Sequence, residues 1–292
     1  MAATLERVTF RTGRLLDFCS EKELTAQTGH QKADWPLVVL KELMDNALDA
    51  CEEARVAPEI SVTVNSQGIT VADNGPGLPQ ETIKGVMDYS VRVSSREAYM
   101  APDWGAQGNA LKTIIAMPFV LDGKEGKVII SAGGLDSIIT FRVDQIRQEP
   151  HIDLDTQESS VKTGTRVKVC WPDLASSMLA EQKLRFLQIG NDYTWLNPHL
   201  TLTLGWFDSI RVTKATNPEW TKWKASDPTC PHWYDTDSLS RLIAAYLSHD
   251  MDNGRSGWLG SLSLSFVGYL AAPSKRLFWK ALDWPANRYP AL

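Results

Sequence analysis

The chain has 292 residues, of which 43% are hydrophobic and 22% are charged, a balance that excludes intrinsic disorder and fibrous repeats. This length suits about two domains of roughly 150 residues each. The formal net charge of −5 argues against a protein whose whole surface binds nucleic acid and leaves room only for a local basic patch.

Charge and tryptophan are unevenly distributed along the chain. The first 200 residues hold 20 basic and 27 acidic side chains, whereas the remaining 92 hold 10 and 8. Composition therefore suggests two regions that meet near residue 200. The second region contains most of the 11 tryptophans: Trp206, Trp220, Trp223, Trp233, Trp258, Trp279 and Trp284.

Cysteine spacing and hydropathy exclude several classes of protein. The four cysteines lie far apart, without a C-x-x-C pair, so neither a zinc site nor a disulfide framework is indicated. The N-terminus lacks the apolar segment of a signal peptide, and no run of 18 apolar residues occurs in the sequence. We therefore expect a soluble, cytoplasmic protein without membrane contact.

The first strong pattern is a helix. Residues 1–34 are polar and weakly patterned, and we interpret them as an N-terminal arm. In residues 37–54 the apolar side chains recur at intervals of three and four, which predicts an amphipathic helix. Its core-facing stripe is expected to consist of Leu37, Leu40, Met44, Ala47 and Cys51.

A β-hairpin and a loop rich in glycine and proline follow. Residues 59–64 alternate between apolar and polar, residues 65–68 form a polar turn, and residues 69–72 are a second short apolar run. Residues 73–79 contain too much Gly and Pro for a regular element, and a short helix is expected near residues 80–89.

The rest of the pattern mixes helices with strands, which favours an α+β fold with helices on a mixed sheet over a doubly wound parallel sheet. After a polar stretch, a helix beginning near residue 109 is expected to end at Pro118. The further elements expected are strands over 127–131, 137–143, 165–171 and 200–204, and a helix near 176–190.

Three clusters have residue types suited to chemistry. Glu42, Asn46 and Asp49 are spaced i, i+4 and i+7, so they share a helix face opposite the apolar stripe. On spacing alone, an ordinary solvated surface is the favoured interpretation of this face. The presence of the other two clusters in the same sequence favours a ligand-binding site.

The second cluster is Asp73 with Gly75 and Gly77, since glycines let a backbone approach a ligand closely. The third is Gly105-x-x-Gly108, which precedes a helix whose free N–H groups favour an anion such as phosphate. Lys112 could add a positive charge there. Neither the Walker pattern nor a G-x-G-x-x-G fingerprint is present, so a nucleotide site must be of another kind.

Together and in this order, the motifs resemble the GHKL ATPase superfamily of gyrase, Hsp90, histidine kinases and MutL, and within it the B subunit of DNA topoisomerase VI. The resemblance spans roughly residues 8–250 and is most specific between residues 36 and 117. It rests on E-x-x-x-N-x-x-D-A (Glu42, Asn46, Asp49, Ala50), D-x-G-x-G (Asp73, Gly75, Gly77), G-x-x-G-x-x-L-K (Gly105, Gly108, Leu111, Lys112) and G-T-x-V (Gly164, Thr165, Val167).

The resemblance implies a Bergerat-type ATP-binding sandwich with Mg²⁺ as a second cofactor. Glu42 matches the general base and Asn46 the Mg²⁺ ligand. Asp73 matches the carboxylate that accepts a hydrogen bond from adenine, with Thr165 in support. The residues implied in cofactor binding are Asn46, Asp49, Asp73, Gly75, Gly77, Ser95, Arg96, Gly105, Ala106, Gln107, Gly108, Asn109, Ala110, Leu111, Lys112 and Thr165.

The resemblance also implies a domain plan and partners. We expect an arm over residues 1–34, the ATPase domain over 35–205, and over 206–292 a small, mainly helical region that starts like the helical insert of the topoisomerase VI protein. Residues 254–292 match nothing, and a transducer domain, with the Lys that reaches the γ-phosphate, is expected to be absent. The expected partners are a second copy in an ATP-dependent homodimer, a DNA-cleaving partner like the topoisomerase VI A subunit, and DNA through that assembly.

Three functions remain open at this point. The leading hypothesis is an ATP-hydrolysing subunit of a type IIB topoisomerase-like complex, gated by ATP-driven dimerisation. The alternatives are a non-catalytic, ATP-dependent dimerisation module and a stand-alone GHKL ATPase that does not act on DNA. A kinase of the histidine-kinase branch is disfavoured, because those domains generally lack the carboxylate at Glu42.

Overall fold

The computed structural model describes residues 18–87, 110–144, 149–222, 235–242 and 244. The chain divides into two compact units, Met1–Lys222 and Trp223–Leu292. The larger unit contains a mixed sheet with helices, as the α+β prediction required. Its helices are α1 (Glu21–Thr28), α2 (Trp35–Glu53), α3 (Gln80–Val86), α4 (Ala110–Asp122), α5 (Ser176–Glu181) and α6 (Lys183–Leu196), with short 3₁₀ turns at Lys32–Asp34 and Asp173–Ala175.

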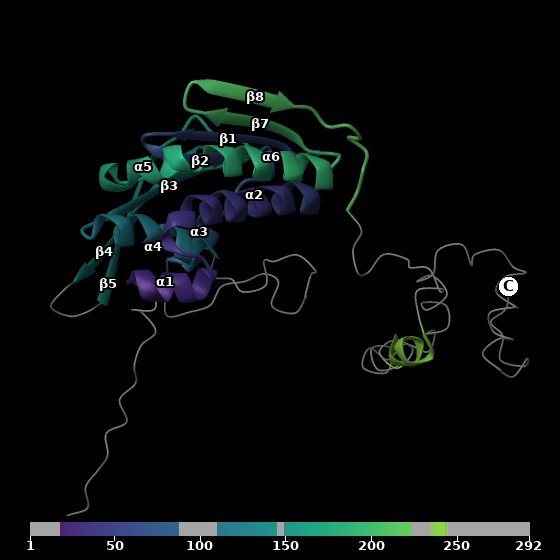
Figure 1. The fold of residues 1–292 in the computed structure, drawn as a ribbon, viewed down its shortest axis with the longest axis horizontal. Coiled ribbons are helices and arrows are strands. Elements are labelled where there is room, and N and C mark those ends of the chain that lie inside the picture. Colours follow the sequence, from purple (N-terminus) through teal and green to yellow (C-terminus); the bar gives the residue numbers. More distant parts are fainter. Residues whose placement is uncertain (1–17, 88–109, 145–148, 223–234, 243, 245–292) are drawn as a thin grey trace, which may run out of the picture. The chain divides into compact units, whose positions relative to one another are not determined.

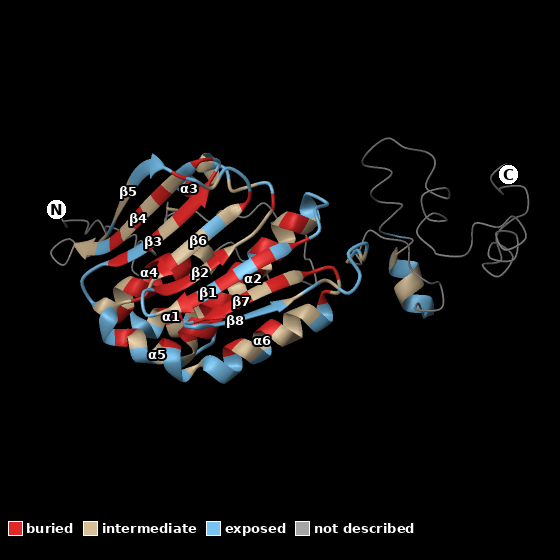
Figure 2. Cartoon of the chain, turned by 90° about the horizontal axis from the view of Figure 1, so that it is seen from above, coloured by how far each residue is buried: buried red, intermediate tan, exposed pale blue. Residues whose placement is uncertain are grey.

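The eight strands form one sheet in the order β5-β4-β3-β6-β2-β1-β7-β8 (Figures 1 and 2). Only the β1–β7 pair is parallel among these neighbours, and the others are antiparallel. The strands are β1 (Glu59–Asn65), β2 (Gly68–Ala72), β3 (Gly126–Ala132), β4 (Leu135–Asp144), β5 (Glu149–Glu158), β6 (Thr165–Cys170), β7 (Thr201–Trp206) and β8 (Ser209–Thr213).

The core lies between the sheet and the helices that cover one of its faces (Figures 1 and 2). β1 shows the reason, because Ile60, Val62 and Val64 are buried while the residues between them are exposed. The predicted stripe of α2 is confirmed in full, since its members are all 5% exposed or less: Leu37, Leu40, Met44, Ala47 and Cys51. α2 therefore presents its opposite, polar face away from the core.

α2 ends where the chain must turn back toward the sheet. Arg55 adopts a positive φ of 58°, and the N–H of Val56 donates to the Cys51 carbonyl oxygen at 2.9 Å. This left-handed residue after the last turn satisfies carbonyl groups that the helix leaves without a partner. Pro58 then precedes β1, which places the end of α2 beside the first strand.

The prediction that the helix near residue 110 ends at Pro118 is wrong. Proline disfavours a helix interior because it lacks an N–H and its ring crowds the preceding turn. α4 nevertheless continues to Asp122, because the following turn packs into the core. Phe119 lies against Phe141 with ring centroids 5.3 Å apart, and Leu121 is 9% exposed.

Other elements were not expected from the pattern. α1 lies within the segment interpreted as a weakly patterned arm, and the helix expected near 176–190 is divided into α5 and α6. β8 continues the sheet beyond residue 205, where the resemblance implied a small, mainly helical region. Its side chains are mostly exposed, including Ile210 and Val212, so it has no buried alternation that could predict a strand.

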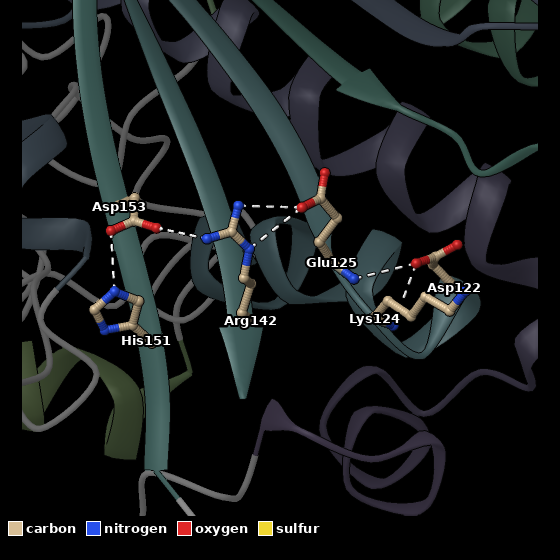
Figure 3. A network of polar contacts seen from close by, with 6 residues as sticks. All are labelled: Asp122, Lys124, Glu125, Arg142, His151 and Asp153. Carbon is tan, nitrogen blue, oxygen red and sulfur yellow. Dashed lines mark hydrogen bonds and ion pairs between the residues drawn. The ribbon is translucent and has the colours of Figure 1, made fainter. Parts of the chain in front are cut away.

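Polar contacts join the edge strand β5 to β4, and β4 to the turn before β3 (Figure 3). Arg142 of β4 donates to Glu125 Oε2 at 3.2 Å through Nε and Nη2, and to Asp153 Oδ2 at 3.1 Å. His151 Nε2 lies 3.0 Å from Asp153 Oδ1. Asp122 accepts from the backbone N–H groups of Lys124 and Glu125 in the turn before β3. Because Arg142 is about half exposed, this network contributes little to stability.

The second unit is described only over residues 235–242 and 244. Residues 236–242 are helical, and Asp235 Oδ1 caps them by accepting from the Ser238 N–H at 2.7 Å. Across the part of the chain that the structure describes, no helix is both long enough and apolar enough to cross a membrane.

Candidate functional site

Asp73 sits at the end of β2 with one carboxylate oxygen held by the backbone. Its Oδ1 accepts from the Gly75 N–H at 2.8 Å and from the Thr165 N–H at 3.1 Å. Burial raises the pKa of Asp73, and these two hydrogen bonds oppose the shift. Since both hydrogen bonds use Oδ1, the other oxygen, Oδ2, can accept a hydrogen bond from a ligand.

Two loops meet here because glycine permits a close backbone approach. Gly164 has a φ of +71°, and a Cβ there would lie 1.9 Å from the Asp73 carbonyl oxygen. Its N–H donates to the Gly75 carbonyl oxygen at 3.0 Å. Gly77 has a φ of +87° and lies so close to Gly164 that a Cβ would be 3.2 Å from its carbonyl oxygen. Close backbone contact thus requires glycine at residue 77, as predicted. The requirement is stricter at residue 164, where a Cβ would lie nearer to backbone atoms.

Asn74 anchors the same loop to the end of α2 and the start of β1. Its Oδ1 accepts from the Glu59 N–H at 2.9 Å and from the Cys51 thiol at 3.3 Å, and its Nδ2 donates to the Ala57 carbonyl oxygen at 3.0 Å. Burial raises the pKa of Cys51 to about 11, so the thiol stays protonated and keeps donating. Asn74 therefore ties the Asp73 loop to the end of α2.

The polar face of α2 lines one side of the same cavity. Glu42, Asn46 and Asp49 all line it. Burial raises the pKa of Glu42, and the positive charge of Lys41 opposes that shift. Asn46 is exposed on the cavity wall. Its amide is therefore accessible to a ligand.

A second helix, α6, lies beside α2 (Figure 1), and its Tyr193 reaches the polar face of α2. The Tyr193 hydroxyl donates to Asp45 Oδ1 and lies 3.3 Å from the Lys41 carbonyl oxygen. Asp45 Oδ2 accepts from Lys41 Nζ at 2.6 Å. Burial, together with the charge of Asp45, raises the pKa of the Tyr193 hydroxyl, so it remains a donor. α2 and α6 are thus linked at the edge of the cavity.

These elements line an open cavity of about 1380 Å³. That exceeds the roughly 300–1,000 Å³ typical of small-molecule sites, so a nucleotide with its phosphates would fit. The cavity wall also includes Trp220 and Lys222, beyond β8. Lys222 Nζ lies 3.9 Å from Glu52 Oε2, and the Trp220 ring lies 4.8 Å from that of His199. The chain that follows the sheet therefore returns to the cavity.

The predicted site residues fall into three groups. Asn46, Asp49, Asp73, Gly77, Ala110, Leu111 and Thr165 line the cavity together with Glu42. Gly75 supports Asp73 from the loop, whereas Lys112 is 1% exposed and is not part of the described cavity wall. The remaining predicted residues lie outside the described part of the chain: Ser95, Arg96, Gly105, Ala106, Gln107, Gly108 and Asn109.

Sequence reasoning missed several residues of the site. Gly164 belonged to a motif but had no predicted role, and Asn74 was interpreted only as part of a turn. Asp45 and Tyr193 carry no local signal, because they lie 148 positions apart. A tyrosine on a half-buried helix is common, so only the packing of α6 against α2 identifies Tyr193 as a residue of the site.

The residues present fit a magnesium ion bound through a nucleotide. Within the described ranges, no cluster of three or more His, Cys, Asp or Glu side chains could by itself hold a metal ion. Mg²⁺ typically binds one or two protein oxygen ligands, with water and substrate phosphates completing its shell. Asn46, exposed on the cavity wall, offers one such oxygen.

Part of the chain is similar to known proteins. Residues 31–175 match the family model of histidine kinase-, DNA gyrase B-, and HSP90-like ATPases. Among curated relatives, the B subunit of type 2 DNA topoisomerase 6 from Archaeoglobus fulgidus is 29% identical over 174 residues, covering 57% of this chain and 28% of the relative. The same protein from Natronomonas pharaonis is 28% identical over 233 residues, covering 74% and 27% respectively.

The chain thus spans little more than a quarter of the length of these relatives. Among solved structures, the Aquifex aeolicus MutL ATPase domain complexed with ADP is similar at 18% identity and a TM-score of 0.39, covering 61% of this chain and 63% of that chain. The motif series, the mixed sheet and the family match coincide between α2 and β6. Over residues 31–175, the chain is thus similar to the histidine kinase-, DNA gyrase B- and HSP90-like ATPases.

Proposed function

We propose that the cavity binds ATP with Mg²⁺ and hydrolyses it. The observation that carries this proposal is the arrangement of Asp73, whose Oδ1 is held by two backbone N–H groups while Oδ2 is left for a ligand, in one cavity with Glu42 and Asn46. Asp73 accepts a hydrogen bond from the adenine amino group, and Thr165 lies beside it. A fixed acceptor of this kind selects a base that carries a donor.

Glu42 and Asn46 act at the phosphate end. Glu42 orients and deprotonates the attacking water, which requires its carboxylate to be ionised at neutral pH. Lys41 favours that ionised form against the effect of burial. Asn46 holds Mg²⁺, which, when bound, offsets the negative charge of the phosphates.

We further propose that the chain acts as the ATP-dependent subunit of a DNA topoisomerase-like assembly. The curated relatives named above support this proposal, since both are subunits of a type 2 DNA topoisomerase. In such an assembly ATP would join two copies of the chain, and a second type of subunit would cleave DNA. The net charge of −5 is consistent with DNA meeting the assembly rather than this domain alone.

The test compares Glu42→Gln with the wild type in the full chain with Mg²⁺. Glutamine keeps the shape of the side chain but cannot take a proton, so turnover should fall by about 10²-fold or more while a non-hydrolysable ATP analogue binds as before. Glu181→Gln, an exposed change on α5, serves as the control and should not alter turnover.

Two outcomes would contradict the proposal. If the wild type binds no analogue at millimolar concentration, the site assignment is wrong. If it binds and dimerises with the analogue but its turnover equals that of buffer, the chain is a nucleotide-dependent dimerisation module instead. A Glu42→Gln variant with wild-type turnover would refute the base assignment alone.

A further inference from the structure

The contacts between α2 and α6 converge on one carboxylate, Asp45. Each of its oxygens has a different donor, because Oδ1 accepts from Tyr193 and Oδ2 accepts from Lys41 Nζ at 2.6 Å. An i, i+4 Lys–Asp pair on an open helix surface is usually loose and weak. Here the two side chains are only about a third exposed, and a hydroxyl from another helix holds the acceptor. The Lys41 side chain is therefore restrained at its charged end.

The restrained ammonium lies beside Glu42. Lys41 Nζ is 3.8 Å from Glu42 Oε1, and the Glu42 side chain is 27% exposed. The charged groups that act on Glu42 are Lys41, Asp45 and, from the segment before α2, His30. The ion pair of Glu42 with Lys41 uses Oε1, so the other oxygen, Oε2, can face a water molecule in the cavity. A cation fixed on one side of a carboxylate restricts its rotation.

We propose that Tyr193, Asp45 and Lys41 form a positioning relay for the hydrolytic step, in which Tyr193 and Asp45 hold Lys41 so that Lys41 orients the Glu42 carboxylate. This inference rests on the proposed function of Glu42. Lys41, Asp45 and Tyr193 all line the cavity, and in the relay only Lys41 acts directly on Glu42. They are positioning residues and should affect turnover more than nucleotide binding.

The relay extends the site beyond the segment that matches the family. That match ends at residue 175, whereas Tyr193 lies in α6, which also contacts β7 and α2. A hydrogen bond from α6 thus makes the geometry of Glu42 depend on how α6 packs against α2. The hydroxyl of Tyr193 carries this dependence, because its ring would still fill the same space in a phenylalanine variant.

The experiment measures kcat, KM and the Kd of a non-hydrolysable ATP analogue for the full chain with Mg²⁺. The variants are Tyr193→Phe, which removes only the hydroxyl, Lys41→Met, which removes the charge, Lys41→Arg, which restores it, and the double variant Tyr193→Phe with Lys41→Met. The control is Lys168→Met, since Lys168 of β6 donates to Gln67 at 3.1 Å on the exposed surface and lies outside the described cavity wall.

Lys41→Met should lower kcat roughly tenfold or more, while KM and the analogue Kd stay within about threefold of the wild type. Tyr193→Phe should lower kcat about threefold or more in the same manner, and Lys41→Arg should recover part of the loss. Because Tyr193 acts through Lys41, the double variant should be no slower than Lys41→Met alone. Lys168→Met should match the wild type in all three quantities.

Other results would overturn the relay. These are a kcat of Lys41→Met within about twofold of the wild type, equal losses in kcat and analogue affinity, or additive effects in the double variant. If Lys41→Arg is as slow as Lys41→Met, the charge is not what matters and the inference is wrong. If the wild type itself neither binds the analogue nor turns over ATP, the proposed function fails first and the relay falls with it.

Discussion

The contact between the Asp73 loop and Gly164 allows a quantitative test of the site's construction. Gly164→Ala places a Cβ 1.9 Å from the Asp73 carbonyl oxygen and 2.9 Å from its carbon. An ordinary contact begins at 3.4 Å, so the two backbone segments must separate by about 1.5 Å. The clashing atoms of Asp73 belong to the backbone, so rotation of a side chain cannot relieve the clash.

Gly29 provides a matched control. Its φ of +70° is nearly the same as the +71° of Gly164, but a Cβ there meets nothing within 4 Å. Gly29→Ala should therefore show only the strain of a left-handed alanine, about 1 kcal/mol. Gly164→Ala adds steric overpacking of about 1–3 kcal/mol and weakens the Gly164–Gly75 and Thr165–Asp73 hydrogen bonds, about 1 kcal/mol each.

We thus expect Gly164→Ala to lower the free energy of unfolding by at least about 2 kcal/mol more than Gly29→Ala, and Tm by at least about 4 °C more. Denaturation followed by circular dichroism measures this difference. Binding of the ATP analogue should be lost or strongly weakened in Gly164→Ala and retained in Gly29→Ala. Equal destabilisation of the two variants, within about 0.5 kcal/mol, would refute the argument that close backbone approach requires this glycine.

Three further predictions concern charge. Because burial raises the pKa of Asp73, its ionisation destabilises the folded protein as pH rises through that pKa. Asp73→Asn should therefore have a Tm about 1–3 °C above that of the wild type at pH 7 without ligand, with a smaller difference near pH 4, and a lower Tm would contradict this. The same variant should bind the ATP analogue more weakly. Arg142→Ala should lower Tm by less than about 3 °C, and less at high salt than at low; a salt-independent loss would show that the network is not screened by solvent. Chelation of Mg²⁺ should weaken analogue binding in the wild type but hardly in Asn46→Ala, and an equal effect in both would exclude Asn46 as the ligand.

Local patterns predicted those parts of the fold whose signal lies within one element. The stripe of α2 repeats at the helical period, and each turn buries the same face, so all five predicted core residues are buried. The β1–β2 hairpin was predicted equally well, because residues 65–68 mark its turn, β1 alternates and β2 is a short apolar run. The cluster of Glu42, Asn46 and Asp49 followed from helix geometry alone.

Elements at the margins were poorly predicted for a common reason. β8 has mostly exposed side chains, so its sequence lacks the alternation that burial imposes, and β5 is likewise an edge strand of the sheet. α4 passes Pro118 because the packing of Phe119 and Leu121 offsets the cost of an interior proline. The edge strands are fixed by pairing with the strand before them, and the end of α4 is fixed by core packing, and neither leaves a buried alternation in the sequence.

By itself, the sequence specified the fold class, the family motifs and the helix face on which Glu42 and Asn46 stand, because these depend on spacing within short segments. Only the tertiary structure showed that Gly164 meets Asp73, that Asn74 ties its loop to α2, and that Tyr193 reaches Asp45 across 148 positions. The physical reason is that such contacts are made when sheet and helices pack together, and no periodicity in the chain encodes which distant side chains will then touch.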